Sequence, residues 1–250
     1  MMEGLREALQ YLVDLGNDGQ KTEIVEILGK TYANRQLVRY GQPERASALQ
    51  AASLVSLVEY IARCSDEFPE ALGMLIHVVD PKTVRLLSGL DKERKRECLF
   101  ECRAETSEFD FGYWYDQERF MVELQANFQP SPDLDLLLKF AGNVEKKNSQ
   151  TYSDDGRTQV ATAQIGVASK SDVIVPNPVI LIPYRTFQEV EQPSSQFVFR
   201  MGNKEEPTFA LFEAENNIWK NEAVSNIKTF FEESLEPLPE AVRERIVILG

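Results

Sequence analysis

The sequence has only three cysteines and a single histidine among its 250 residues. Three cysteines cannot form a disulfide framework, which favours a protein that folds in a reducing compartment. Cys64, His77, Cys98 and Cys102 also lack the paired C-x-x-C spacing of zinc sites. His77 stands inside the apolar run MLIHVV, a setting typical of a strand residue rather than of a general base. We therefore expect no metal site and no cofactor.

Long apolar runs are missing as well. No stretch approaches the roughly 20 apolar residues that are needed to cross a bilayer. No basic segment followed by an apolar run opens the chain, as a secretory leader would. We expect a soluble, cytoplasmic protein with no membrane attachment.

Basic side chains are too few to balance the acidic ones. Twenty-seven Lys and Arg against 40 Asp and Glu give a formal net charge of −13, which repels nucleic-acid phosphates and anionic lipid. We therefore expect no nucleic-acid ligand. Residues 205–250 alone carry ten carboxylates against four basic groups. Such a region is either a solvated surface or a mimic of nucleic acid, so an acidic decoy of a host nucleic-acid-binding protein remains an alternative function.

The apolar positions change period along the chain, from helical to alternating and back. The 43% of apolar residues can fill a substantial core. Helical spacing is found over 43–64, 116–142 and 217–235, and alternation over 73–103 and much of 144–215, with RIVILG as a last strand. Ser47 with Gln50 has capping-box spacing, and Ser131 with Pro132 predicts the start of a second helix within 116–142. These patterns predict an α+β fold, with packed helices on a mostly antiparallel sheet and a long C-terminal helix.

The N-terminal segment predicts an amphipathic helix. Leu5, Leu9 and Leu12 recur at helical spacing, and GNDG at 16–19 ends the pattern. Such a helix either packs on its own core or docks on a neighbouring subunit, which makes these leucines oligomer-interface candidates. We expect residues 1–30 to form this helix and a connecting arm, and residues 31–250 to form one body. A weak boundary near 103–115 remains open.

A β-hairpin is predicted near the C-terminal third, with SQFVFRM and TFALFEAE paired across GNKEEP. If residue 201 lies opposite 208, then Phe197 faces Phe212 and Phe199 faces Ala210, so that these aromatic side chains pack on one side. The preceding VILIPYR is also β-like. QEVEQPSS at 188–195 then becomes a connection between two strands.

Charged side chains flank this connection. Arg185, Glu189, Glu191 and Arg200 either hold the loop in place or engage a partner, and we take them as partner-binding candidates. None of them is a nucleophile beside an activating base. We therefore assign no catalytic residue.

Three runs carry a resemblance to a known group of proteins: SDDGRTQ at 153–159, NPVILIPYRTFQEVEQPSSQFVFR at 177–200 and FALFEAENNIWKNEA at 209–223. They resemble the C-terminal half of uncharacterised phage and prophage proteins of the enterobacterial YfdQ group. The resemblance implies a phage-borne protein in the cytoplasm of a bacterial host. It implies no activity and no catalytic residue.

Two short segments imitate known chemical motifs. LGKT at 28–31 imitates the end of a phosphate loop, but the glycine required five positions before Gly29 is replaced by Ile24. Asp133, Glu145 and Lys147 imitate a metal-dependent nuclease, although negative charge in the first turn of a helix is favourable by itself. The nuclease stays as the enzymatic alternative. The leading hypothesis is a non-enzymatic phage or prophage protein that acts through homo-oligomeric assembly, or through binding of a host or phage protein.

Overall fold

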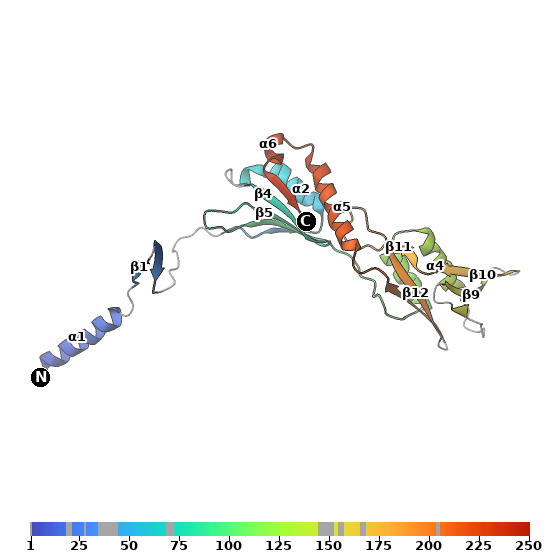
Figure 1. Ribbon diagram of the computed structural model, residues 1–250, viewed down its shortest axis with the longest axis horizontal. Helices are drawn as coiled ribbons and strands as arrows, with labels where there is room; N and C mark the ends of the chain where they lie inside the picture. The colour runs from blue at the N-terminus through green and yellow to red at the C-terminus, as the bar shows by residue number, and fades with distance from the viewer. Residues whose placement is uncertain are drawn as a thin grey trace. The chain divides into compact units, whose positions relative to one another are not determined.

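The computed structural model describes residues 2–18, 22–27, 29–34, 45–68, 73–144, 153–154, 158–165, 169–203 and 206–250. The chain divides into two compact units, residues 1–45 and 46–250. Each unit is described by itself (Figure 1).

The first unit begins with the predicted amphipathic helix. This helix, α1 (Met2–Asp18), continues two residues beyond Gly16. Strands β1 (Ile24–Ile27) and β2 (Lys30–Ala33) follow it as an antiparallel hairpin. Gly29 has φ 74° in the turn, a left-handed conformation that glycine adopts at little cost.

The second unit contains a five-stranded sheet in the order β14-β4-β5-β6-β3. The segment 73–103, whose apolar residues alternate, forms its centre as an antiparallel meander of β4 (Met74–Asp80), β5 (Thr83–Ser88) and β6 (Cys98–Arg103). β14 (Ile246–Leu249) and β3 (Leu49–Ala51) add parallel edges beside β4 and β6. The last strand expected at RIVILG is therefore confirmed.

Two helices pack on this sheet, α2 (Leu54–Arg63) and α5 (Trp219–Leu235), and both appear on the same side of it in Figure 1. Leu54, Leu57 and Ile61 of α2 are fully buried, and each contributes roughly 1.5–3 kcal/mol through the apolar surface it removes from water. The 3-10 turn η1 (Ser65–Glu67) follows α2, and α6 (Glu240–Arg243) follows α5. Within the described residues, no helix is both long and apolar enough to cross a membrane.

The helix predicted over 43–64 is wrong in its first half. Residues 49–51 form β3 instead, because they pair with β6 from Leu49 opposite Phe100 to Ala51 opposite Cys102. The helix begins at Leu54, where the Ser53 hydroxyl accepts a hydrogen bond from the Val55 amide at 3.2 Å. Ser53 is therefore the N-cap, and the capping box at Ser47 is not formed. Residues 43 and 44 lie outside the described residues.

A four-stranded antiparallel sheet in the order β11-β12-β13-β7 supports a second core. Its strands are β11 (Val179–Leu181), β12 (Ser195–Asn203), β13 (Pro207–Glu213) and β7 (Tyr115–Asp116). The predicted helix pair, α3 (Gln117–Asn127) and α4 (Pro132–Asn143), contributes to this core. Ser131 caps α4 by accepting from the Leu134 amide at 3.2 Å, and Pro132 is its first residue, as expected.

The hairpin of β12 and β13 is confirmed, but its predicted register is wrong by one residue. Phe197 lies opposite Glu213, Phe199 opposite Leu211, and Met201 opposite Phe209. A slip of one residue exchanges the two faces of a strand. Phe209 and Leu211 therefore join Phe197 and Phe199 in the core, whereas Phe212 is 37% exposed. Arg200 accordingly pairs with Ala210.

A three-stranded antiparallel sheet completes the second unit. It contains β10 (Ser169–Pro176), β9 (Thr158–Ile165) and β8 (Ser153–Asp154) in that order. Together, these elements confirm the predicted α+β class, with mostly antiparallel sheets and a long C-terminal helix α5.

Candidate functional site

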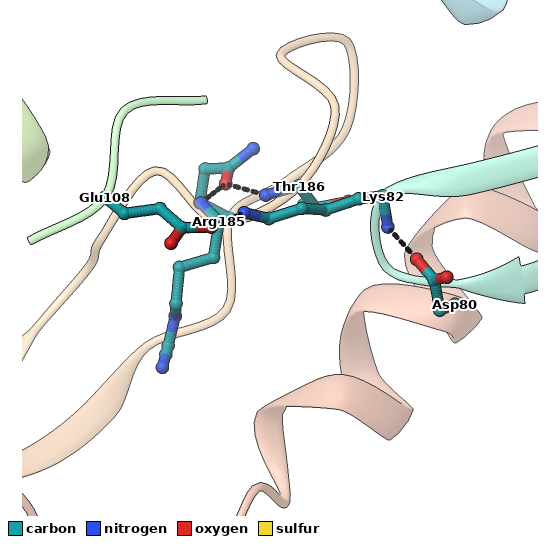
Figure 2. Close-up of polar contacts among 6 residues, drawn as sticks. Asp80, Lys82, Glu108, Arg185 and Thr186 are labelled. Carbon is teal, nitrogen blue, oxygen red and sulfur yellow. Dashed lines mark hydrogen bonds and ion pairs between the residues drawn. The ribbon is translucent and has the colours of Figure 1, made fainter. Parts of the chain in front are cut away.

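The connection between β11 and β12 is held by the side chain of one buried glutamine. Gln192 accepts hydrogen bonds from the Arg185 and Thr186 amides at 2.9 and 3.2 Å. Its Nε2 donates to the carbonyls of Phe187 and Val190 at 2.8 and 3.3 Å. Figure 2 shows the hydrogen bonds that the backbone amides of Arg185 and Thr186 donate. One side chain thus serves four backbone groups and fixes the path of residues 185–192.

The same loop packs into the core that the five-stranded sheet forms with α2 and α5. Phe187 and Val190 are buried in that core with α2 and α5, and the Thr186 hydroxyl donates to the carbonyl of Pro81. Glu189 Oε1 accepts from the Ser53 hydroxyl at 2.6 Å and from the Leu54 amide at 2.8 Å. A carboxylate at a helix N-terminus satisfies free amides and complements the helix dipole. Glu189 therefore supports the start of α2.

Arg185 is a buried cation. Its side chain donates to Glu213 Oε1 at 3.1 Å and to the Ser195 hydroxyl at 2.7 Å, and its guanidinium carbon lies 4.1 Å from the centre of the Trp219 ring. Burial lowers the pKa of Arg185 to about 10, although the Glu213 carboxylate opposes this effect. The guanidinium is thus held rigidly between an acid, a hydroxyl and an aromatic face.

A cavity of about 460 Å³ lies against Arg185. The turn between β4 and β5, the segment before β7, the loop after β11 and the start of α5 all contribute side chains to it. Figure 2 shows Asp80, Lys82 and Glu108 near the loop that carries Arg185. Its full lining is Asp80, Pro81, Lys82, Ser107, Glu108, Phe109, Phe111, Asn127, Pro183, Tyr184, Arg185, Glu213, Asn217, Trp219 and Lys220.

Of the four partner-binding candidates, Arg185 alone lines this cavity. Glu189 caps α2. Glu191 is exposed, and its backbone carbonyl accepts from the Asn226 side chain at 3.0 Å. Arg200 lies in β12 and donates to the carbonyl of Phe199 at 3.3 Å. The interface candidates Leu5, Leu9 and Leu12 lie on α1 and are 64, 55 and 61% exposed.

The residues of the nuclease alternative are only partly described. Asp133 Oδ2 accepts from the Ile180 amide at 2.7 Å, so this carboxylate links α4 to β11. Glu145 and Lys147 lie outside the described residues. Within the described part of the chain, no three His, Cys, Asp or Glu side chains come together as metal ligands would.

Sequence reasoning missed Gln192, Asn127 and Glu213 as members of the site. A glutamine that binds its own loop and a carboxylate that pairs with a buried arginine follow no sequence motif. The proximity of Trp219 to Arg185 depends on where α5 begins in space. Asn217, two residues before α5, has φ 58°, and asparagine tolerates this conformation well among non-glycine residues; the pair NN at 216–217 was a weak sequence signal.

A separate charged cluster lies on the five-stranded sheet. Glu101 accepts from Arg85 Nε and Arg103 Nε, each at 2.6 Å. The hydrogen bond from Arg85 lowers the pKa of Glu101 and Arg103 adds to this, although burial acts in the opposite direction.

Replacing Glu101 with glutamine is expected to change how stability depends on pH. Because the folded pKa of Glu101 lies below its usual value of 4.5, the carboxylate stabilises the fold above that pH, and this stabilisation is lost as pH falls through the folded pKa. The difference in free energy of unfolding between wild type and Glu101→Gln should therefore shrink below pH 4.5. Urea unfolding at several pH values measures it, with the exposed Glu105→Gln as control. A difference that does not vary with pH would contradict this role.

Comparison of the chain with known protein families, with curated proteins and with solved structures finds no match.

Proposed function

We propose that the chain is a non-enzymatic protein, encoded by a phage or prophage, that acts by assembling with copies of itself through α1. The observation that carries this proposal is the exposed apolar stripe of α1, formed by Leu5, Leu9 and Leu12. More than half of each of these side chains is open to solvent. Tyr11, Val13 and Leu15 of the same helix are also exposed.

The spacing of the stripe favours packing of helix against helix. Leu5, Leu9 and Leu12 are separated by four and then three residues, the repeat that aligns side chains along the seam of a coiled coil. A helix of 17 residues is only marginally stable by itself in water. Burial of the leucines against the same stripe of another copy would stabilise both the helix and the assembly.

The charges of α1 favour another protein over a membrane as the partner. The sequence of residues 2–18 contains four acidic residues and a single basic one, Arg6. Helices that lie on membranes are usually rich in Lys and Arg, which attract anionic lipid. A leucine stripe is complementary to itself, so a second copy of the chain satisfies it.

The contacts around residues 185–192 support a role without catalysis. Gln192 holds the loop, Glu189 caps α2, and Arg185 is paired with Glu213. The side chains of Arg185, Glu189 and Gln192 thus have structural partners. The resemblance to phage and prophage proteins supports the bacterial cytoplasm as the setting, with a phage or host protein as a further partner of the assembly.

Replacing Leu9 with glutamate should dissociate the assembly. A carboxylate in an apolar seam loses its hydration without gaining a partner. The neighbouring Gln10→Glu is the matched control, because it introduces the same charge at an exposed polar position beside Leu9; it also removes the hydrogen bond of 3.2 Å that Gln10 donates to Asp14. In light scattering, we expect wild type and Gln10→Glu to exceed the mass of one chain, and Leu9→Glu to have the mass of one chain.

The molecular mass of the wild-type protein can also refute the proposal. A wild-type mass of one chain at every concentration, unchanged when residues 1–18 are removed, would refute assembly through α1. Salt offers a second check. Each copy carries a net charge of −13, so screening of the mutual repulsion should strengthen association as ionic strength rises.

A further inference from the structure

Strand β14 leaves one edge of the five-stranded sheet open. It stands at the end of the order β14-β4-β5-β6-β3, so that among the described strands only β4 lies beside it. The Met74 amide donates to the Arg245 carbonyl at 2.7 Å. Because a parallel ladder uses alternate residues of a strand, Ile246 and Ile248 turn their backbone N–H and C=O groups away from β4. Outside the strand ladders, the described residues form no backbone hydrogen bond with these outward groups.

This edge lacks the features that usually protect the edge of a sheet. β14 reads IVIL, without the charged residues or the proline that commonly prevent pairing at an edge. Its side chains Val247 and Leu249 are 55 and 49% exposed. The other edges of the five- and four-stranded sheets are shorter or blocked: β3 and β7 have three and two residues, and in β11 the Ile180 amide donates to Asp133 at 2.7 Å. Among these four edges, β14 is therefore the one best suited to receive another strand.

The edge of β14 is complementary to itself. In an antiparallel pair about a two-fold axis at Val247, Ile246 of each copy lies opposite Ile248 of the other, and every outward N–H and C=O group of these residues gains a partner. Ile246 and Ile248 pack against the core with α2 and α5, so Val247 lies on the opposite face of the sheet. There it meets Val247 of the second copy. This register places no charged side chain opposite a like charge within IVIL, although each copy carries a net charge of −13.

We propose that β14 pairs antiparallel with β14 of a second copy and thereby joins two five-stranded sheets into one continuous sheet. The contact rests on the proposed assembly through α1. A strand of four residues buries less than the roughly 1,000 Å² that a stable interface needs, so this pairing does not hold two free copies together. Copies that are already joined at α1 have a high effective concentration, which makes a weak second contact sufficient.

Charges introduced at Val247 test both the pairing and its register. Val247→Lys and Val247→Glu each place like charges opposite one another across the axis, which destabilises a cross-strand pair. Because the second contact is lost, each variant alone should dissociate at a concentration at least about tenfold higher than wild type does, measured by light scattering over a dilution series. An equal mixture of the two variants places lysine opposite glutamate and should regain most of this loss. Val247→Thr, which stays uncharged and β-branched, is the control and should dissociate as wild type does.

Hydrogen exchange at single amides gives a test that requires no change in β14. In the assembled wild type, the Ile246 and Ile248 amides should exchange at least about tenfold more slowly than in Leu9→Glu, which lacks the α1 contact. The Val247 and Leu249 amides turn toward β4 and should exchange alike in both proteins. This comparison remains decisive if a variant at residue 247 fails to fold.

Two results would overturn the proposal and leave assembly through α1 intact. One is an assembled wild type in which the Ile246 and Ile248 amides exchange as fast as in Leu9→Glu. The other is an equal mixture of Val247→Lys and Val247→Glu that associates no more strongly than either variant alone. Slow exchange of Ile246 and Ile248 in Leu9→Glu would show that the same chain covers this edge, and would equally refute the pairing. A wild-type mass of one chain would instead refute the proposed function on which this inference rests.

Discussion

Replacing Phe209 with alanine is expected to lower the free energy of unfolding by about 3–5 kcal/mol and the melting temperature by roughly 6–20 °C. Phe209 is fully buried, and its ring centre lies 5.3 Å from that of Phe120 and 6.2 Å from that of Phe199. Alanine would leave a cavity between β13 and α3 that packed neighbours cannot close. Chemical denaturation of the purified variants measures the loss.

Phe212 provides the matched control for this prediction. It belongs to the same strand three residues later, but it is 37% exposed on the opposite face. Phe212→Ala should cost only about 1 kcal/mol. A larger loss for Phe212→Ala than for Phe209→Ala would show that residue 201 lies opposite 208, as the sequence pattern predicted, and that the observed register is wrong.

The second large effect is expected for Gln192→Leu, with a loss of at least about 3 kcal/mol of unfolding free energy. The leucine would fill a similar volume but would leave the amides of Arg185 and Thr186 and the carbonyls of Phe187 and Val190 without this partner. Removing one member of a buried hydrogen-bonded group costs the desolvation of every group left behind. The same denaturation experiment measures the effect.

Gln188→Leu is the control for Gln192, because Gln188 is exposed in the same loop. It should change stability by no more than about 0.5 kcal/mol. Gln192→Glu distinguishes the contribution of the accepting oxygen from that of the donating nitrogen, since glutamate keeps acceptor oxygens and has no N–H donor. Equal stability of Gln192→Leu and Gln188→Leu would rule out the role assigned to Gln192.

Most helices and strands could be predicted where a local signal and the apolar period agree. The meander of β4, β5 and β6 alternates regularly between turn signals, and Ser131 with Pro132 marks the start of α4. The helix expected from residue 43 failed because two signals competed. Ser47 and Ser53 both precede apolar residues, and pairing of Leu49 with Phe100 in β6 decides between them. That partner is distant in sequence and invisible to a local pattern.

The register of the hairpin could not be decided from its two strands. In TFALFEAE, Phe209 and Phe212 lie on opposite faces of the strand. Each of the two registers therefore places one of these phenylalanines on the core face, beside Phe197 and Phe199 of β12: Phe209 in the observed register and Phe212 in the predicted one. The choice depends on α3, whose Phe120 stacks on Phe209. An apolar pattern therefore predicted the hairpin but not which of its faces the rest of the fold would cover.

The candidate site was predictable only in part. Arg185 stood out as a charged residue next to an apolar strand, and the loop after it was expected. Its burial could not be foreseen, because it depends on Trp219 and Glu213 from α5 and β13. Glu189 was singled out for its charge, yet its contacts with Ser53 and Leu54 make it a cap for a helix far earlier in the chain.

Strand β14 enters the five-stranded sheet next to β4, although most of the second unit separates the two in sequence. During translation, β4 leaves the ribosome early, and the edge that pairs with β14 stays open until β14 has been synthesised. An open strand edge is a template for wrong pairing, and such distant pairing is slow to form. Nascent chains that stop short of residue 246 should therefore engage chaperones more strongly than the complete second unit does.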